Sequence, residues 1–209
     1  LPIFFALKAY KMDVILQELG KYKNSLMARE MALSLLKPMA LELKNLVSQG
    51  SLSSEKEQVV MALLRFYAGD LLYQTTERRE RVSINVLVAG MEGGNCDLET
   101  IMAGLIANHY GFNYSFYGAN NSLEVLCESL SFLKTHLLVL NVTKAFVQFG
   151  KVFVQSFVEK IISQSQPSLE IILLGNLDLE FVRIPTKRVH IVKSIESLDE
   201  LLQYKTVSL

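Results

Sequence analysis

The chain has 209 residues, of which half are hydrophobic and a fifth charged, so it is long enough for one large or two small globular domains. Its 21 basic and 21 acidic side chains cancel, which argues against a nucleic-acid-binding surface within this chain. Apolar runs are shorter than the ~20 residues that span a bilayer, which argues against a membrane protein.

From residue 1 to about 78, apolar residues recur at helical spacing. The pattern predicts helices over residues 2–10, 12–22 and 28–47, and a fourth that begins at Ser53 or Ser54. Pro38 lies inside the third, so that helix must kink or restart. Ser54 and Glu57 have the spacing of a capping box. Four helices with short connections predict a bundle over residues 1–78, ended by the polar stretch 75–81.

Beyond Ser83 short apolar runs alternate with helical patterns. Strands are predicted at 84–89, 112–117, 137–142, 169–174 and 189–192, and helices at 96–110, 122–133, 144–163 and 195–204. This alternation predicts a parallel, doubly wound, five-stranded sheet of Rossmann-like (flavodoxin-like) α/β type over residues 83–209. In such folds ligands bind beyond the carboxyl ends of the strands, here the loops 90–96, 118–121, 141–144 and 175–178.

Motifs for catalysis are missing from the sequence. It has no Gly-x-Ser-x-Gly, no Cys-x-x-Cys and no His-x-x-x-His, and the glycines of 91–95 satisfy neither nucleotide fingerprint. His109, His136 and His190 are expected to have structural roles, the first as a cation at a helix end. The two cysteines, Cys96 and Cys127, fit a reducing cytoplasm. We therefore expect a cytoplasmic protein that is not an enzyme and has no membrane contact.

The segment Ile84–Asn141 has an apolar strand, a glycine-bearing loop, a helix, a strand ending in Gly-Ala and a further helix. This order resembles the cobalamin-binding Rossmann-like module. The preceding bundle resembles that of the cobalamin-dependent, light-sensing regulators of the MerR type. Five residues fall into register with the bundle motif of those regulators: Pro38, Gly50, Leu52, Ser53 and Glu57.

The resemblance implies a ligand site whose positions have largely changed. Val47 stands where the family has the Trp above the cofactor, and Gln58, after Glu57, where it has a His. Cys96 replaces the His that ligates cobalt from below, and Gly94 the acidic residue that orients it. The remaining family positions are Gly118, Asn141, Thr143 and Gly175. We expect no bound cofactor. Cys96 is the one candidate metal ligand, and its simpler interpretation is a small residue at a helix start.

Three functions follow from the resemblance. The first is a non-catalytic sensory and oligomerisation module of a MerR-like transcription regulator, which self-associates and contacts DNA through a domain preceding Leu1. The second is a sensor of haem or another ligand, held between the bundle and the sheet, with Cys96 as candidate ligand. The third is a corrinoid carrier of a methyltransferase system, which would need the missing lower histidine.

Overall fold

The computed structural model describes residues 2–74, 82–93, 98–175 and 187–207, without the Lys144 side chain. The chain divides into two compact units, Leu1–Arg78 and Arg79–Leu209. The predicted linker, residues 75–81, lies outside the described residues.

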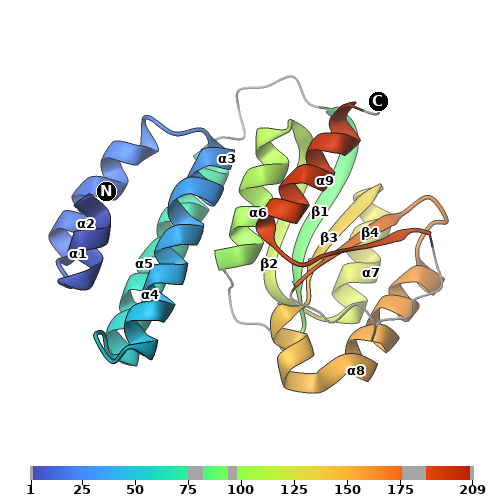
Figure 1. Ribbon diagram of the computed structural model, residues 1–209. Coiled ribbons are helices and arrows are strands. Elements are labelled where there is room, and N and C mark those ends of the chain that lie inside the picture. Colours follow the sequence, from blue (N-terminus) through green and yellow to red (C-terminus); the bar gives the residue numbers. More distant parts are fainter. Residues whose placement is uncertain (1, 75–81, 94–97, 176–186, 208–209) are drawn as a thin grey trace. The chain divides into compact units, whose positions relative to one another are not determined.

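The first unit is helical (Figure 1). Its elements are α1 (Pro2–Lys8), α2 (Met12–Lys23), α3 (Ala28–Glu30), the π-helical η1 (Met31–Leu36), α4 (Lys37–Ser48) and α5 (Ser54–Gln74). Helix α1 packs on α2 and α4, and α5 packs on α2 and α4. The apolar faces that the sequence pattern predicts meet in the core, where Ile15, Leu43 and Leu64 are fully buried.

The predicted break at Pro38 takes the form of a π-helical segment. A proline inside a helix has no N–H to donate and crowds the carbonyl four residues earlier. The wider turns of Met31–Leu36 come directly before α4, whose first turn contains Pro38. The chain therefore stays helical from Ala28 to Ser48, because the change of geometry accommodates the proline without ending the helix.

Helix α5 is capped by a different serine from the one that the capping-box spacing indicated. The helix begins at Ser54, and the Oγ of Ser53 accepts a hydrogen bond of 3.4 Å from the backbone N–H of Lys56. Ser53 is therefore the N-cap residue. Helix α4 ends at a left-handed glycine, since Gly50 has φ 69° and its N–H donates to the carbonyl of Val47.

The second unit is a five-stranded parallel sheet in the order β2-β1-β3-β4-β5, the flavodoxin-like doubly wound arrangement predicted above. The strands are β1 (Val82–Met91), β2 (Phe112–Asn121), β3 (Leu137–Asn141), β4 (Glu170–Leu174) and β5 (Val189–Val192). Helices α6 (Leu98–His109) and α9 (Ile195–Val207) cover one face, and α7 (Leu123–Phe132) and α8 (Thr143–Gln164) the other (Figure 1). Strand β3 lies in the centre and every residue in it is buried, as its apolar run predicts.

Two elements differ from their predictions. Strand β2 continues through 118–121, where a loop was expected, because Gly118 (φ 67°) and Asn120 (φ 62°) let the backbone turn irregularly beside the end of β1. Helix α8 is interrupted at Gly150, whose φ of 77° and ψ of 179° are not helical. The spacing of apolar residues in the sequence cannot predict this bend, because the bend depends on backbone angles that only the glycine adopts readily.

A charged cluster joins β4, β5 and α9 near the amino end of the sheet. The Glu170 carboxylate accepts hydrogen bonds from His190 Nε2, at 3.0 Å, and from Lys205 Nζ. Burial opposes ionisation of Glu170, but the two hydrogen bonds outweigh it and hold the pKa of this carboxyl below its usual value.

We expect Glu170→Gln to lower the free energy of unfolding of this unit by about 0.5–1 kcal/mol at pH 7, since the carboxylate is partly exposed and screened. A lowered folded-state pKa stabilises the protein above the unfolded-state pKa, and the gain is lost as the pH falls through the folded-state pKa. The stabilities of variant and wild type should therefore converge in acid. Urea titrations at pH 7 and pH 3 test this, and an unchanged difference at both pH values would contradict it.

Candidate functional site

A hydrogen-bonded cluster links α6, β3 and α8 at the carboxyl end of the central strand. Nδ2 of Asn141, the last residue of β3, donates to Glu99 Oε2 at 3.4 Å and to Thr100 Oγ1 at 3.1 Å. Oγ1 of Thr143 donates to Glu99 Oε2 at 3.3 Å, and its backbone N–H to Asn141 Oδ1 at 3.1 Å. Asn141 and Thr100 are buried. These polar groups therefore bond to one another, as buried polar groups must.

Gly175, directly after β4, lies tightly against this cluster. A Cβ atom on Gly175 would come within 2.8 Å of Thr143 Oγ1 and within 3.3 Å of the backbone nitrogen of Thr143. The position thus requires glycine because the start of α8 fills the space above it. Three of the predicted site positions, Asn141, Thr143 and Gly175, lie together and contact one another.

The ends of β1 and β2 form a second close arrangement. The buried Asn121 donates from Nδ2 to the carbonyls of Gly90, at 3.0 Å, and Gly118, at 3.1 Å. The backbone N–H of Gly93 donates to Asn120 Oδ1 at 2.9 Å. The predicted site residue Gly118 is thus held at the carboxyl edge of the sheet by a neighbouring side chain that joins the two strands.

The side chain of Phe149 lies over Gly93. A Cβ on Gly93 would stand 2.2 Å from Phe149 Cε2. The Phe149 ring packs on Phe153 with centroids 4.7 Å apart, and Phe153 on Phe157 at 6.2 Å. The row of rings therefore crosses the bend of α8 at Gly150, from Phe157 in the core to Phe149 beside the loop after β1.

The other predicted site positions are not in these clusters. Gly94 and Cys96 lie outside the described residues. Val47, at the end of α4, and Glu57, in α5, are half-buried, and Gln58 is exposed. All three belong to the first unit.

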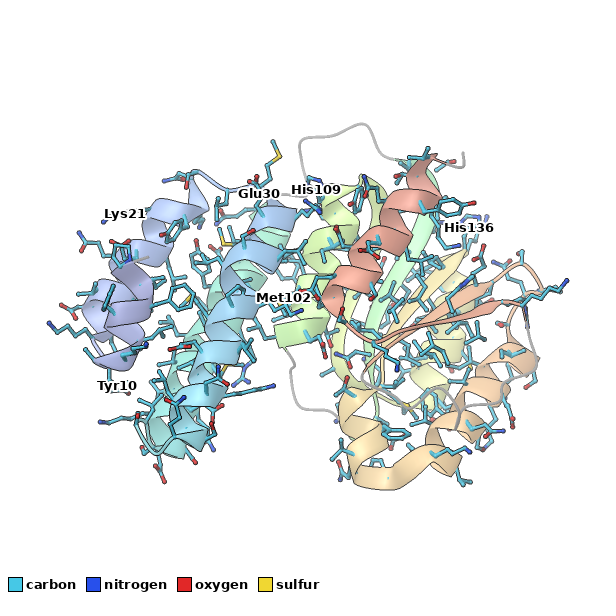
Figure 2. All side chains as sticks on the ribbon, in the orientation of Figure 1. Tyr10, Lys21, Glu30, Met102, His109 and His136 are labelled. Atoms are coloured by element: carbon cyan, nitrogen blue, oxygen red, sulfur yellow. The ribbon has the colours of Figure 1, made fainter. Side chains whose placement is uncertain are left out.

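The histidines lie away from the carboxyl ends of the strands. His109 lies at the end of α6 (Figure 2). Its ring meets that of Tyr110 edge-on, with centroids 5.1 Å apart. His136 precedes β3, and its Nδ1 accepts a 3.0 Å hydrogen bond from the backbone N–H of Asn85. His190 bonds to Glu170. Among the described residues, no group of three or more His, Cys, Asp or Glu side chains could hold a metal ion.

Glu99, Thr100 and Phe149 were not predicted as site residues. Glu99 lies in the first turn of α6, and its carboxylate bonds to two of the predicted positions, Asn141 and Thr143. Thr100 is the third residue of α6, and its sequence context indicates only an ordinary helical position. Phe149 stood in an apolar run of α8, and only the bend at Gly150 turns it to the edge of the sheet.

No known protein family matches the chain by its sequence profile, and no curated protein matches it either. Solved structures do resemble it. The monomethylamine corrinoid protein of Methanosarcina barkeri has a TM-score of 0.73 and 8% identity, covering 97% of this chain and 96% of its own. The methanol:cobalamin methyltransferase complex MtaBC of the same organism has a TM-score of 0.51 and 10% identity, covering 100% of this chain and 79% of that chain.

A cobalamin-binding protein from Desulfitobacterium hafniense DCB-2 matches with a TM-score of 0.48 and 14% identity, over 97% of each chain. At such identities the likeness concerns the fold. The chain has the Rossmann-like α/β fold of cobalamin-binding proteins. Among the described residues no helix has the length and apolar character needed to cross a membrane.

Proposed function

We propose that this chain is a non-catalytic sensory module of a MerR-like transcription regulator, built on the fold of cobalamin-binding proteins but not holding cobalamin. One observation carries the second part of the proposal. The polar side chains at the carboxyl end of β3 satisfy one another through Glu99. A ligand that used these groups would have to break bonds that the protein already makes, and the lost bonds would offset part of its binding free energy.

The residues present do not fit the cofactor. The described residues at the carboxyl edge contribute no imidazole or thiolate that could ligate cobalt, and the sequence has Cys96 where the family has histidine. The space above Gly93 is taken by Phe149, and that above Gly175 by Thr143. Thr143 is half-buried and Phe149 is 45% exposed, and a group bound against either glycine would have to displace the side chain that packs on it.

The regulatory part of the proposal is supported by the bundle motif. Gly50 and Ser53 occupy positions of the MerR-type bundle motif. In this structure Gly50 ends α4 in the left-handed conformation, and Ser53 is the N-cap residue of α5. The two residues therefore support a bundle like that of the MerR-type regulators, but they do not indicate which ligand is bound. The zero net charge is consistent with DNA contacts made by another part of a regulator.

A second candidate is a corrinoid carrier of a methyltransferase system, since the monomethylamine corrinoid protein matches over nearly the whole of both chains. Such a carrier works with protein partners. The absence of a histidine at position 96 disfavours it, because neither Cys96 nor Gly94 supplies the oriented imidazole.

Cobalamin binding tests the proposal. After incubation with hydroxocobalamin or adenosylcobalamin and exhaustive dialysis, we expect the purified chain to retain much less than one equivalent, measured by its absorption spectrum. Loss of the axial ligand removes affinity, and loss of the residue that orients it removes about a further 10–100-fold. As a matched comparison, Cys96→His with Gly94→Glu should raise retention only in part, because Phe149 and Thr143 stay in place.

Stoichiometric cobalamin in the wild-type chain would instead establish the carrier function and overturn the proposal. A parallel incubation with haemin distinguishes the remaining candidate. A Soret band that shifts on binding and disappears in Cys96→Ala would identify a haem sensor with Cys96 as the ligand.

A further inference from the structure

Helix α8 has two parts whose buried faces do not line up. In the second part, residues 151–164, the side chains of Val154, Val158 and Ile161 are fully buried and recur at helical spacing. Val147 lies seven residues before Val154, and residues seven apart share one face of a continuous helix. Val147 is nevertheless 82% exposed, so its own unit does not cover it. The first part of α8 is therefore turned away from the orientation that the helical period gives it.

Gly150 causes this change of face. Its φ of 77° and ψ of 179° are angles that only glycine adopts readily, and they interrupt the helical hydrogen bonds that would span it. Figure 1 shows the resulting bend between the two parts of α8. Apart from its chain neighbours, no described residue has an atom within 4 Å of a Cβ added at Gly150. The surroundings of Gly150 therefore leave room for another backbone conformation.

The bend places the Phe149 ring on the loop after β1. A Cβ added to Gly93 would stand 2.2 Å from Phe149 Cε2, and the ring packs on Phe153 with centroids 4.7 Å apart. In a continuous helix Phe149 would share a face with Ser156, which lies seven residues later and is exposed. The ring therefore reaches Gly93 only because the helix is interrupted.

The bent helix and a continuous helix have opposing advantages. The bent form keeps the contacts of Phe149 with Gly93 and Phe153. The continuous form gains the interrupted backbone hydrogen bonds and brings the apolar side chain of Val147 to the buried face. Because glycine populates positive and negative φ about equally, position 150 admits both forms.

We propose that α8 is a conformational switch, whose second part extends back through Gly150 to Val147 and withdraws Phe149 from the loop after β1. The residues before Val147 then form the connection from β3. A molecule seated against Gly93 keeps the ring away, and it shifts the equilibrium to the continuous form. The inference rests on the proposed sensory function only in that a sensor needs two conformations. It requires no particular ligand.

Nuclear magnetic resonance of the full chain tests the switch, because saturation-transfer and relaxation-dispersion experiments detect a minor form that exchanges in microseconds to milliseconds. We expect a second state in which the Cα shifts of residues 147–150 are helical. Gly150→Ala should raise the ratio of the second state to the bent one about tenfold or more, because alanine disfavours positive φ and favours the helix. Ser156→Ala is the matched control. It places alanine at an exposed helical position of α8 and should leave the ratio unchanged.

Phe149→Ser shifts the same equilibrium without a change at Gly150. Loss of the ring contacts should raise the ratio about two- to tenfold, whereas Val152→Ser, at a 79% exposed position of α8, should leave it unchanged. The inference is overturned if neither the wild-type chain nor Gly150→Ala shows the helical shifts, or if Phe149→Ser does not raise the ratio. Because no cobalamin is added, the result is separate from that of the cofactor incubation.

Discussion

Replacing Gly93 with alanine should lower the free energy of unfolding of the α/β unit by about 2–4 kcal/mol. Gly93 has φ 86°, where a side chain is strained by about 1–3 kcal/mol. The added Cβ would also stand 2.2 Å from Phe149 Cε2. The ring can turn away, but it then loses its contact with Phe153, which is worth about 0.5–1.5 kcal/mol.

Two further variants separate these causes. In Gly93→Ala with Phe149→Ala the steric part should disappear and the backbone strain remain, so the two substitutions are not additive. Gly150→Ala measures backbone strain alone, because φ is 77° and no atom lies within 4 Å of the added Cβ. The chain has no tryptophan, so hydrogen exchange of β1 and α8 peptides is the suitable measurement. Equal stabilities of Gly93→Ala and wild type would refute the packing of Phe149 on this loop.

The fold was accessible from the sequence because its signals are periodic and local. Apolar runs such as Leu137–Asn141 are too short for helices and recur between helical patterns. Such alternation of strands and helices predicts a parallel sheet with helices on both faces, which is the fold observed. The capping serine was misassigned by one position because Ser53 and Ser54 are chemically equivalent. Only the backbone geometry decides between them.

The residues of the candidate site could be predicted from the sequence only in part. The carboxyl ends of neighbouring parallel strands meet at one edge, so Asn141, Thr143 and Gly175 could be expected to lie near one another. That Glu99 would bond to two of these residues was not predictable, because a glutamate in the first turn of a helix is usually explained by the helix dipole. The position of the Phe149 side chain depends on the bend of α8, and one glycine, Gly150, is the only sign of that bend in the sequence.

Gly175→Val should be the most damaging single change at the carboxyl edge, lowering the free energy of unfolding of the α/β unit by about 3 kcal/mol or more. The first added carbon alone would lie 2.8 Å from Thr143 Oγ1 and 3.3 and 3.4 Å from the backbone nitrogen and Cα of that residue. Backbone atoms at a helix start cannot move aside as a side chain can. Displacement of Thr143 would also break its bond to Glu99.

Thr143→Ala combined with Gly175→Val should recover only the part of this loss that arises from the Thr143 hydroxyl, since the backbone contacts remain. Gly20→Ala is the opposite control. Gly20 lies exposed within α2 with no atom within 4 Å, so alanine should stabilise the helical unit by about 0.5–1 kcal/mol. Hydrogen exchange of β4 peptides reports the loss. A Gly175→Val chain as stable as wild type would mean that Thr143 does not fill this space, and the packing argument against a bound cofactor would lose one of its two supports.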